Sequence, residues 1–237
     1  MKVVLKIGGS ILLPSPSVNN EVFKRWKEAI TKISNQVEKM AVVVGGGRIA
    51  REYIHAADFA SSYEKDLLGI SITRVNAYLL MLYLKYSNLD VAFDIPTNPE
   101  DVRKLLQDRK LVVLGGYLPG NSTAGVAALT AEAISADLLL VATNVPGIFE
   151  DDPRINPNAR KLKKVHISKL IQMLSVEKSV AGTYFLLDLL ALKVLERSKI
   201  PTIVFDGRNP ENAVNVLVSY MTKDYESIFK YGSLITF

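Results

Sequence analysis

Short apolar runs alternate with helical patterns along almost the whole chain. The apolar runs predict strands at residues 2–7, 40–44, 90–93, 111–114, 138–143, 202–205 and 234–237. Between them, apolar residues that recur every three or four positions predict helices at 21–37, 49–60, 64–86, 98–107, 124–134, 168–174, 188–198 and 209–221. This alternation is typical of an α/β fold with a mostly parallel sheet and helices on both faces. We expect one domain, residues 1–237, with two lobes that divide near residue 135.

The most informative stretch is the second strand together with the turn and helix after it. Val42, Val43 and Val44 predict a buried strand, and three glycines, Gly45-Gly46-Gly47, lead from it into a helix that carries Arg51. Glycine allows the backbone to approach a ligand closely, and the free N–H groups of a helix start attract an anion. The Arg51 guanidinium lies about one turn into the helix and can bind the same anion with two hydrogen bonds. The pattern favours a phosphate site, and the alternative is a tight turn that binds nothing.

Two more glycine turns come after predicted strands. Lys6-Ile7-Gly8-Gly9-Ser10 ends the first strand, and Gly115-Gly116 precedes the polar loop 117–123 and another helix. Taken alone, Lys6 would be an edge or surface residue, and Ser122 and Thr123 would be helix N-caps. Chance explains three such turns poorly. Because ligands of open α/β sheets bind at the carboxyl ends of the strands, we expect the three turns to form one site.

Other polar segments have ordinary interpretations. Asp66 falls in the first turn of a predicted helix, where a carboxylate compensates the helix dipole without any ligand; the functional alternative is a carboxylate that binds two sugar hydroxyls. Pro146-Gly147 predicts the turn of a small hairpin that projects from the sheet, and the acidic residues 150–152 are typical of a solvated turn. Residues 177–183 predict a flexible polar loop.

Composition excludes several classes of function. The chain has no cysteine, which rules out disulfides, thiol catalysis and cysteine-bound metals, and His55 and His166 lack metal-ligand spacing, so we expect no protein metal site. The net charge of +5 is mild and spread along the chain, which suits a small anionic substrate. No basic run interleaved with aromatics suggests nucleic acid. Without a long apolar run or a signal-peptide core, we expect no membrane partner and a cytoplasmic location.

The order of the motifs identifies a family. Lys6-Ile7-Gly8-Gly9-Ser10, Gly45-Gly46-Gly47 with Arg51, Gly115-Gly116 with Pro119-Gly120, and residues 143–145 through Asp152-Pro153 together resemble the amino acid kinase family. Residues 65–70, 73–77 and 181–183 resemble its archaeal UMP-kinase branch in particular. The resemblance covers almost the whole chain. It implies an open αβα sandwich, a hexamer assembled from dimers, and phosphorylation of UMP to UDP by ATP with Mg²⁺.

The resemblance also implies roles for individual residues. UMP would be held by Gly46, Asp66, Tyr117, Leu118, Pro119, Gly120, Asn121, Ser122 and Thr123. ATP would be held by Gly8, Gly9, Ser10, Gly47, Arg51, Thr143, Asn144, Phe149 and Asp152. Lys6, Arg51 and Asp188 would serve catalysis, with Lys6 on the transferring phosphoryl group, and Asp66 would bind the ribose hydroxyls. Such a transfer needs two polyanions held in line and neutralised, and no general base, because a phosphate oxygen of UMP is already nucleophilic.

Two departures from the family pattern leave alternatives open. Ala124 stands where many relatives have an aspartate that orients the active-site lysines, so either Asp188 or Asp152 compensates, or catalysis is slower or lost. Pro146, where UMP kinases commonly have aspartate, and Phe149, often tyrosine, carry less weight. One alternative is a nucleotide-binding or storage protein without catalysis, which Lys6 argues against. Another is a kinase for an acylamino acid or a carbamate, which the Asp66 carboxylate would repel.

Overall fold

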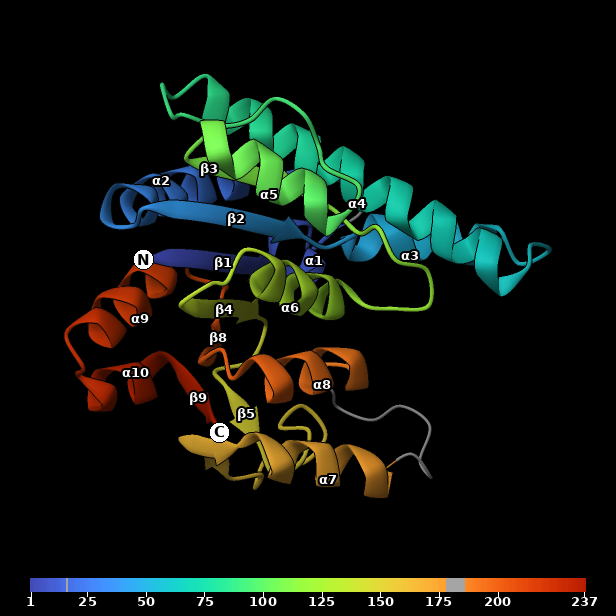
Figure 1. Cartoon of the computed structure of the whole chain (residues 1–237). Coiled ribbons are helices and arrows are strands. Elements are labelled where there is room, and N and C mark those ends of the chain that lie inside the picture. Colours follow the sequence, from blue (N-terminus) through green and yellow to red (C-terminus); the bar gives the residue numbers. More distant parts are fainter. Residues whose placement is uncertain (16, 178–185) are drawn as a thin grey trace.

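The protein is a layered α/β structure built on one seven-stranded sheet (Figure 1). The computed structural model describes residues 1–15, 17–177 and 186–237, and the predicted loop 177–183 falls almost entirely outside them. The sheet has the order β3-β2-β1-β4-β8-β9-β7, and β5 and β6 form a separate small sheet. The strands are β1 (Lys2–Ile7), β2 (Lys39–Val44), β3 (Leu111–Leu114), β4 (Leu138–Thr143), β5 (Ile148–Phe149), β6 (Lys161–Leu162), β7 (Lys164–His166), β8 (Thr202–Asp206) and β9 (Gly232–Thr236).

Helices cover both faces of the sheet. The helices are α1 (Gly9–Leu12), α2 (Asn20–Gln36), α3 (Gly47–Ala56), α4 (Ser62–Lys85), α5 (Pro99–Asp108), α6 (Thr123–Ala133), α7 (Ile167–Glu177), α8 (Leu189–Ser198), α9 (Glu211–Met221) and α10 (Tyr225–Tyr231). Side chains of α2, α4, α9 and α10 share one buried cluster with the sheet, and those of α5, α6, α7 and α8 share another. The predicted open αβα sandwich is therefore confirmed.

The alternation of side-chain direction along the strands explains why a layer of helices covers each face of the sheet. In β1, Val3, Leu5 and Ile7 point into the cluster with α2 and α4, whereas Val4 points into the opposite cluster. Successive strand side chains point to opposite faces, so a strand that is apolar at every position must be covered on both sides. Parallel pairing joins β1 to β2 and β4, and among the described residues the one antiparallel pair of the seven-stranded sheet is β8 with β9.

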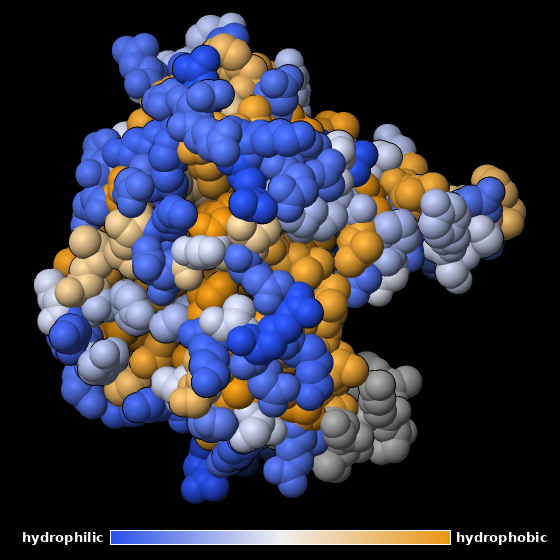
Figure 2. Space-filling view, viewed as in Figure 1, coloured by the Kyte–Doolittle hydropathy of each residue, from blue (hydrophilic) through white to orange (hydrophobic). Residues whose placement is uncertain are grey.

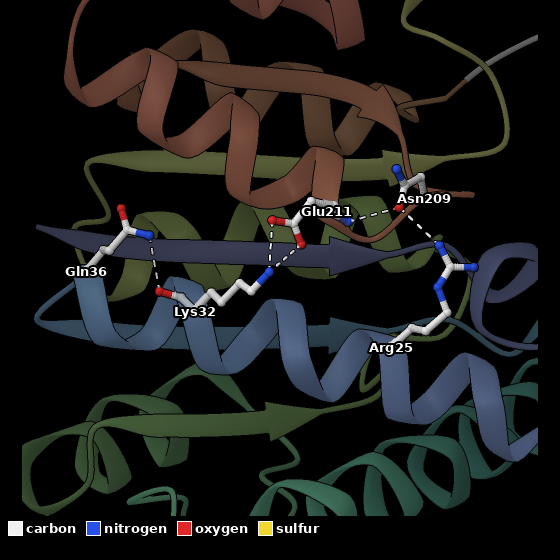
Figure 3. A network of polar contacts seen from close by, with 5 residues as sticks. All are labelled: Arg25, Lys32, Gln36, Asn209 and Glu211. Carbon is white, nitrogen blue, oxygen red and sulfur yellow. Dashed lines mark hydrogen bonds and ion pairs between the residues drawn. The ribbon is translucent and has the colours of Figure 1, made fainter.

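Polar contacts join the first half of the chain to the last. Lys32 of α2 pairs with Glu211 of α9 at 2.8 Å, and Arg25 Nη2 donates to Asn209 Oδ1 at 3.0 Å (Figure 3). Gln36 Nε2 donates back to the Lys32 carbonyl within α2. Because both side chains of the ion pair are about half exposed, the pair adds little to the free energy of unfolding. Apolar packing of α2 on α9 therefore holds these two helices together.

Helix α4 is the longest element, and its N-terminal half projects from the body together with α3 (Figure 1). Apolar side chains are exposed along this arm, and Figure 2 shows the surface hollowed beneath it. They include Tyr53, Phe59, Tyr63 and Leu67, and Val75 and Tyr78 are exposed further along α4. Within the described residues, α4 alone is long and apolar enough to cross a membrane, which is weak support for a span because core helices pass the same test. Its buried face packs on the sheet through Ala77, Leu80 and Leu84.

Several predicted boundaries were wrong. Residues 90–93 form only an isolated bridge, Val91 with Leu111, instead of a strand. Helix α3 begins at Gly47 and ends at Ala56, earlier than predicted at both ends. Pro146-Gly147 precedes the small β5–β6 hairpin, whose turn comes after Phe149. The helix predicted from residue 168 is longer, and α1, α10, β6 and β7 were not predicted.

Candidate functional site

The first two glycine turns meet at the carboxyl ends of the central strands. Strand order reverses its direction around β1, so the ends of β1, β2 and β4 bound one crevice, where α/β sheets bind ligands. Gly8 N donates to the Ala142 carbonyl of β4 at 3.1 Å, and Gly45 N donates to the Ile7 carbonyl of β1 at 3.0 Å. The turn after β1 is thereby fixed against both neighbouring strands.

Close backbone contact explains why these turns are glycine. A Cβ placed on Gly9 would lie 1.9 Å from Gly47 N, and one placed on Gly47 would lie 2.8 Å from the Gly9 carbonyl oxygen. Gly47 also has a φ of +70°, a conformation that other residues adopt only with strain. The predicted phosphate turns are therefore one joined structure in which two backbones touch without side chains between them.

Lys6 lies on β1 beside this junction. Burial lowers the pKa of its ammonium to about 8, and the negative charge of Asp188 opposes that shift. A Cβ on Gly8 would be 3.6 Å from Lys6 Nζ, so the ammonium lies against the first glycine turn. Within the described part of the chain, Nζ has no hydrogen-bond or ion-pair partner. A partly buried ammonium without a partner is costly unless an anion joins it.

Asp188 links two helix N-termini near Lys6. Its Oδ1 accepts from Ala191 N at 2.7 Å as the N-cap of α8, and its Oδ2 accepts from Ser122 N at 3.0 Å at the start of α6. A Cβ on Gly125 would lie 3.1 Å from Oδ2, so glycine leaves room for the carboxylate. Ala124 is buried in the first turn of α6. The carboxylate of Asp188 thus stands at the helix start where Ala124 has none.

The loop after β3 is held by Asp66. Its Oδ2 accepts a hydrogen bond of 2.7 Å from Gly120 N, at a glycine with a φ of +74°. Helix α4 begins at Ser62, where Ser61 and Glu64 form a capping box, so Asp66 lies past the first turn and the expected position was wrong. Glu64, not Asp66, compensates the dipole, which removes the main non-functional explanation for Asp66.

The remaining members of this loop differ in accessibility. Gly120, Asn121 and Ser122 are exposed, and Asn121 Nδ2 donates to the Pro119 carbonyl. The Tyr117 hydroxyl lies close to Thr130 Oγ1 and the Val126 carbonyl of α6, and burial raises its pKa. The hydroxyl of Tyr117 is thus bonded within the protein, and the backbone of Tyr117 remains for contact with a ligand.

Polar side chains of α4 hold the glycine turns from behind. Thr73 Oγ1 accepts from Gly116 N at 2.6 Å and donates to the Ile70 carbonyl. Asn76 Nδ2 donates to the carbonyls of Gly45 and Gly46 at 3.1 and 3.2 Å. Thr73 and Asn76 are both only 6% exposed. In the sequence this segment was notable for its family resemblance only; the missed signal was two polar residues on the buried face of a helix.

A cavity of about 620 Å³ opens beside the joined turns. Of the residues expected to bind ATP or serve catalysis, Ser10, Arg51 and Asn144 line it. Arg48, Glu52 and His55 also line it and were not predicted. These three residues are spaced four and then three positions apart, so together with Arg51 they lie on one face of α3. This spacing could have been read from the sequence. Arg48 is paired with Glu52 at 3.3 Å, whereas Arg51 has no such partner among the described residues.

The other expected ATP residues lie apart from this cavity lining. Thr143 is buried at the end of β4, and its carbonyl accepts from Gly207 N at 2.8 Å. Phe149 lies on β5. Asp152 is 4% exposed and is bound by the Arg154 guanidinium, which lowers its pKa. Because Arg154 occupies its carboxylate, Asp152 is poorly suited to replace the aspartate absent at Ala124.

Comparisons with known proteins show which family and which solved structures this chain is similar to. The family model described as amino acid kinase family matches residues 1–206. The uridylate kinase of Pyrococcus abyssi is 41% identical over 220 residues, which are 92% of this chain and 95% of that protein. That of Sulfurisphaera tokodaii is 41% identical over 221 residues, with the same coverage. The crystal structure of uridylate kinase from Archaeoglobus fulgidus matches over the full length of both chains, with a TM-score of 0.82 and 36% identity.

Proposed function

The chain belongs to the amino acid kinase family, and on that premise we propose that it is a uridylate kinase that transfers the γ-phosphoryl group of ATP to UMP. An oxygen of the UMP phosphate forms a bond to the γ-phosphorus, the bond from that phosphorus to the β,γ-bridging oxygen breaks, and the products are UDP and ADP. The reaction requires that two polyanions approach end to end, so the protein has to supply positive charge and fixed N–H donors where they meet.

The observation that supports this proposal most strongly is the ammonium of Lys6, which lies at the junction of the two glycine turns and has no partner among the described residues. Lys6 stabilises the charge that develops on the transferring phosphoryl group, and Arg51 neutralises the donor from the wall of the cavity. A storage protein could bind nucleotides through the glycine turns alone and would not need a partly buried ammonium at this point. The bound phosphates also offset the desolvation that lowers the pKa of Lys6.

The acceptor and donor occupy opposite sides of the joined turns. Gly46 and the loop of residues 117–123 hold UMP, and Asp66 accepts from its ribose hydroxyls in place of Gly120 N. Gly8, Gly9, Gly47 and the cavity lined by Ser10 and Asn144 hold ATP. Thr143, Phe149 and Asp152 complete the donor side at the end of β4. The lobe of residues 1–135 thus supplies the acceptor site together with the glycine turns and Arg51 of the donor site, and the lobe of residues 136–237 supplies Thr143, Asn144, Phe149 and Asp152.

Asp188 takes the place of the family aspartate that is absent at Ala124. Its charge acts on Lys6, and its second oxygen fixes the start of the acceptor loop's helix through Ser122 N. Asp188→Asn keeps the size of the side chain but removes the charge. We expect turnover to fall by about 10-fold or more while UMP affinity changes little, since the carboxamide oxygen still accepts one backbone bond. A twofold change or less in turnover would argue against this role.

The donor is used as its Mg²⁺ complex. In the described ranges no three His, Asp or Glu side chains come together to form a protein cage for a metal ion. Mg²⁺ keeps several waters and binds through phosphates with few protein ligands, so this donor set fits an ion carried by ATP. When bound, it would neutralise part of the charge on the phosphates. Removing Mg²⁺ with EDTA should abolish UDP formation without preventing UMP binding.

The exposed apolar arm of α3 and α4 supports assembly into homo-oligomers. We propose the hexamer of paired dimers that the family resemblance implies. We also propose that the protein acts in the cytoplasm. Sedimentation of the purified protein tests the assembly. A monomer at micromolar concentration would contradict it.

The decisive experiment measures UDP formation from ATP, Mg²⁺ and a series of nucleoside monophosphates. UMP should be the preferred acceptor, with CMP and dCMP much poorer. Lys6→Ala should lower turnover far more than UMP affinity, and equal loss in both would make Lys6 a binding residue only. Binding of both nucleotides without any UDP would instead support the storage protein, the second candidate, which Ala124 favours.

A further inference from the structure

Arg74 differs from most arginines of this protein in how its guanidinium is used. Seven of the other arginines form ion pairs with carboxylates, and Arg25 donates to Asn209. In the described residues, only Arg51 and Arg74 lack a side-chain partner. Arg74 is partly buried, and its Nε donates to the Gly116 carbonyl at 3.1 Å. The two terminal amino groups of Arg74 have no partner in that part of the chain.

Arg74 lies where the loop after β3, which is proposed to hold the acceptor, meets Gly45-Gly46-Gly47. Gly116 comes shortly after β3, and β3 pairs with β2 so that Leu114 lies beside Val43, just before Gly45. The preceding residue of α4, Thr73, bonds Gly116 N, and its methyl group is 3.5 Å from a Cβ placed on Gly46. One turn of α4 therefore contacts both loops. The Arg74 guanidinium is held beside them by its hydrogen bond to the Gly116 carbonyl.

The position of Arg74 on α4 also matches the length of the acceptor. Asp66, which is assigned to the ribose, lies eight residues earlier on the same helix, a rise of about 12 Å. A short carboxylate and a long guanidinium side chain that converge on the loop after β3 can therefore reach the sugar and the phosphate of one nucleotide. Asp66 bonds Gly120 N and Arg74 bonds the Gly116 carbonyl, so both side chains already lie against this loop.

We propose that Arg74 binds the phosphate of the acceptor nucleotide, with Nε fixed by Gly116 and the terminal amino groups turned to the phosphate oxygens. This inference rests on the proposed function. A planar guanidinium matches two phosphate oxygens, and a partly buried one binds them more strongly than an exposed one does. Lysine would supply the charge but not the simultaneous bond to Gly116.

The experiment separates phosphate binding from support of the loop. The affinities of UMP, CMP and uridine are measured by competition calorimetry without ATP for wild type, Arg74→Lys and Arg74→Leu. The control is Arg103→Leu, which removes an exposed arginine of α5 that pairs with Glu100. Loss of a charged hydrogen-bonded partner should weaken UMP binding of Arg74→Leu by about 10- to 100-fold and leave uridine within twofold. Arg74→Lys should lie between, and Arg103→Leu should match wild type.

Three results would overturn the proposal. Equal weakening of UMP and uridine would show that Arg74 only supports the Gly116 loop. Unchanged UMP affinity in Arg74→Leu would show that it has no role in binding. A change in the ratio of UMP to CMP affinity would show that Arg74 contacts the base. If the wild type binds UMP but forms no UDP, the proposed function fails while the test of Arg74 stands.

Discussion

Replacing Lys6 with methionine should make the unliganded protein more stable while it destroys activity. Burial lowers the pKa of Lys6 from 10.5 to about 8, a difference of 2.5, and each unit corresponds to about 1.4 kcal/mol. The folded protein therefore spends about 3 kcal/mol at pH 7 to keep this ammonium charged. Methionine has a similar length and no charge, so Lys6→Met should raise the free energy of unfolding in urea by about that amount.

The pH dependence has a definite sign. The folded-state pKa of Lys6 is lower than its unfolded-state value, so below pH 8 both states hold the proton and the cost is complete. Between pH 8 and 10.5 the unfolded chain holds more protons, and the stability of the wild type rises with pH relative to the variant. The advantage of Lys6→Met should shrink from about 3 kcal/mol at pH 7 to about 1 kcal/mol at pH 10.

The assay is urea unfolding of both proteins, with and without saturating nucleotides. Lys104→Met, which removes an exposed lysine of α5, is the control and should change stability little at any pH. ATP and UMP should stabilise the wild type and the control more than they stabilise Lys6→Met. The reasoning would be refuted if Lys6→Met were less stable than wild type at pH 7, or if its advantage did not fall at high pH.

Three further predictions test the site and its support. Asp66→Asn should weaken UMP binding by about 10-fold with ATP binding intact, as measured by calorimetry, and unchanged UMP affinity would remove its ribose role. Gly47→Ala should lower the free energy of unfolding by about 2–4 kcal/mol because strain at φ +70° adds to the clash with Gly9, whereas Gly120→Ala, at φ +74° in open space, should cost about 1 kcal/mol. Equal costs would contradict the backbone contact. Lys32→Ala should cost less than about 1 kcal/mol in the same assay, and a larger loss would show that the α2–α9 join depends on its ion pair.

Much of the fold was predictable because buried parallel strands leave a simple trace. Every strand residue of β1 except Lys2 and Lys6 is apolar, and β4 is buried throughout. The wrong predictions concern segments whose secondary structure depends on contacts with distant parts of the chain. Residues 90–93 are apolar enough for a strand, but they form a single bridge to Leu111, at the first residue of β3, instead of a ladder. β7 has a single buried residue, Val165, between two exposed ones, and its pairing with β9 could not be inferred locally.

The candidate site was predictable in its backbone and less so in its side chains. Each glycine turn is a local pattern of strand, turn and helix, so the loops proposed to bind phosphate could be found one at a time. The bond from Ser122 N to Asp188 joins residues 66 positions apart, and no periodicity reports it. The same is true of Thr73 and Asn76, whose partners lie more than 25 positions away. Lys6 was located by motif, but its desolvation, and its lack of a partner within the described ranges, follow only from the three-dimensional packing.

The order of strands in the sheet has a consequence for synthesis on the ribosome. β1 is made first yet lies between β2 and β4, and β4 begins at Leu138, 94 residues after β2 ends at Val44. At about 5 to 20 residues per second, one edge of β1 waits roughly 5 to 20 s for its partner. During that interval a strand that is apolar on both faces has an open hydrogen-bonding edge, beside which the Lys6 ammonium still lacks Asp188. The growing chain is thus most prone to aggregation before the helix α6 and β4 emerge, and a chaperone that covers this edge would be needed most at that stage.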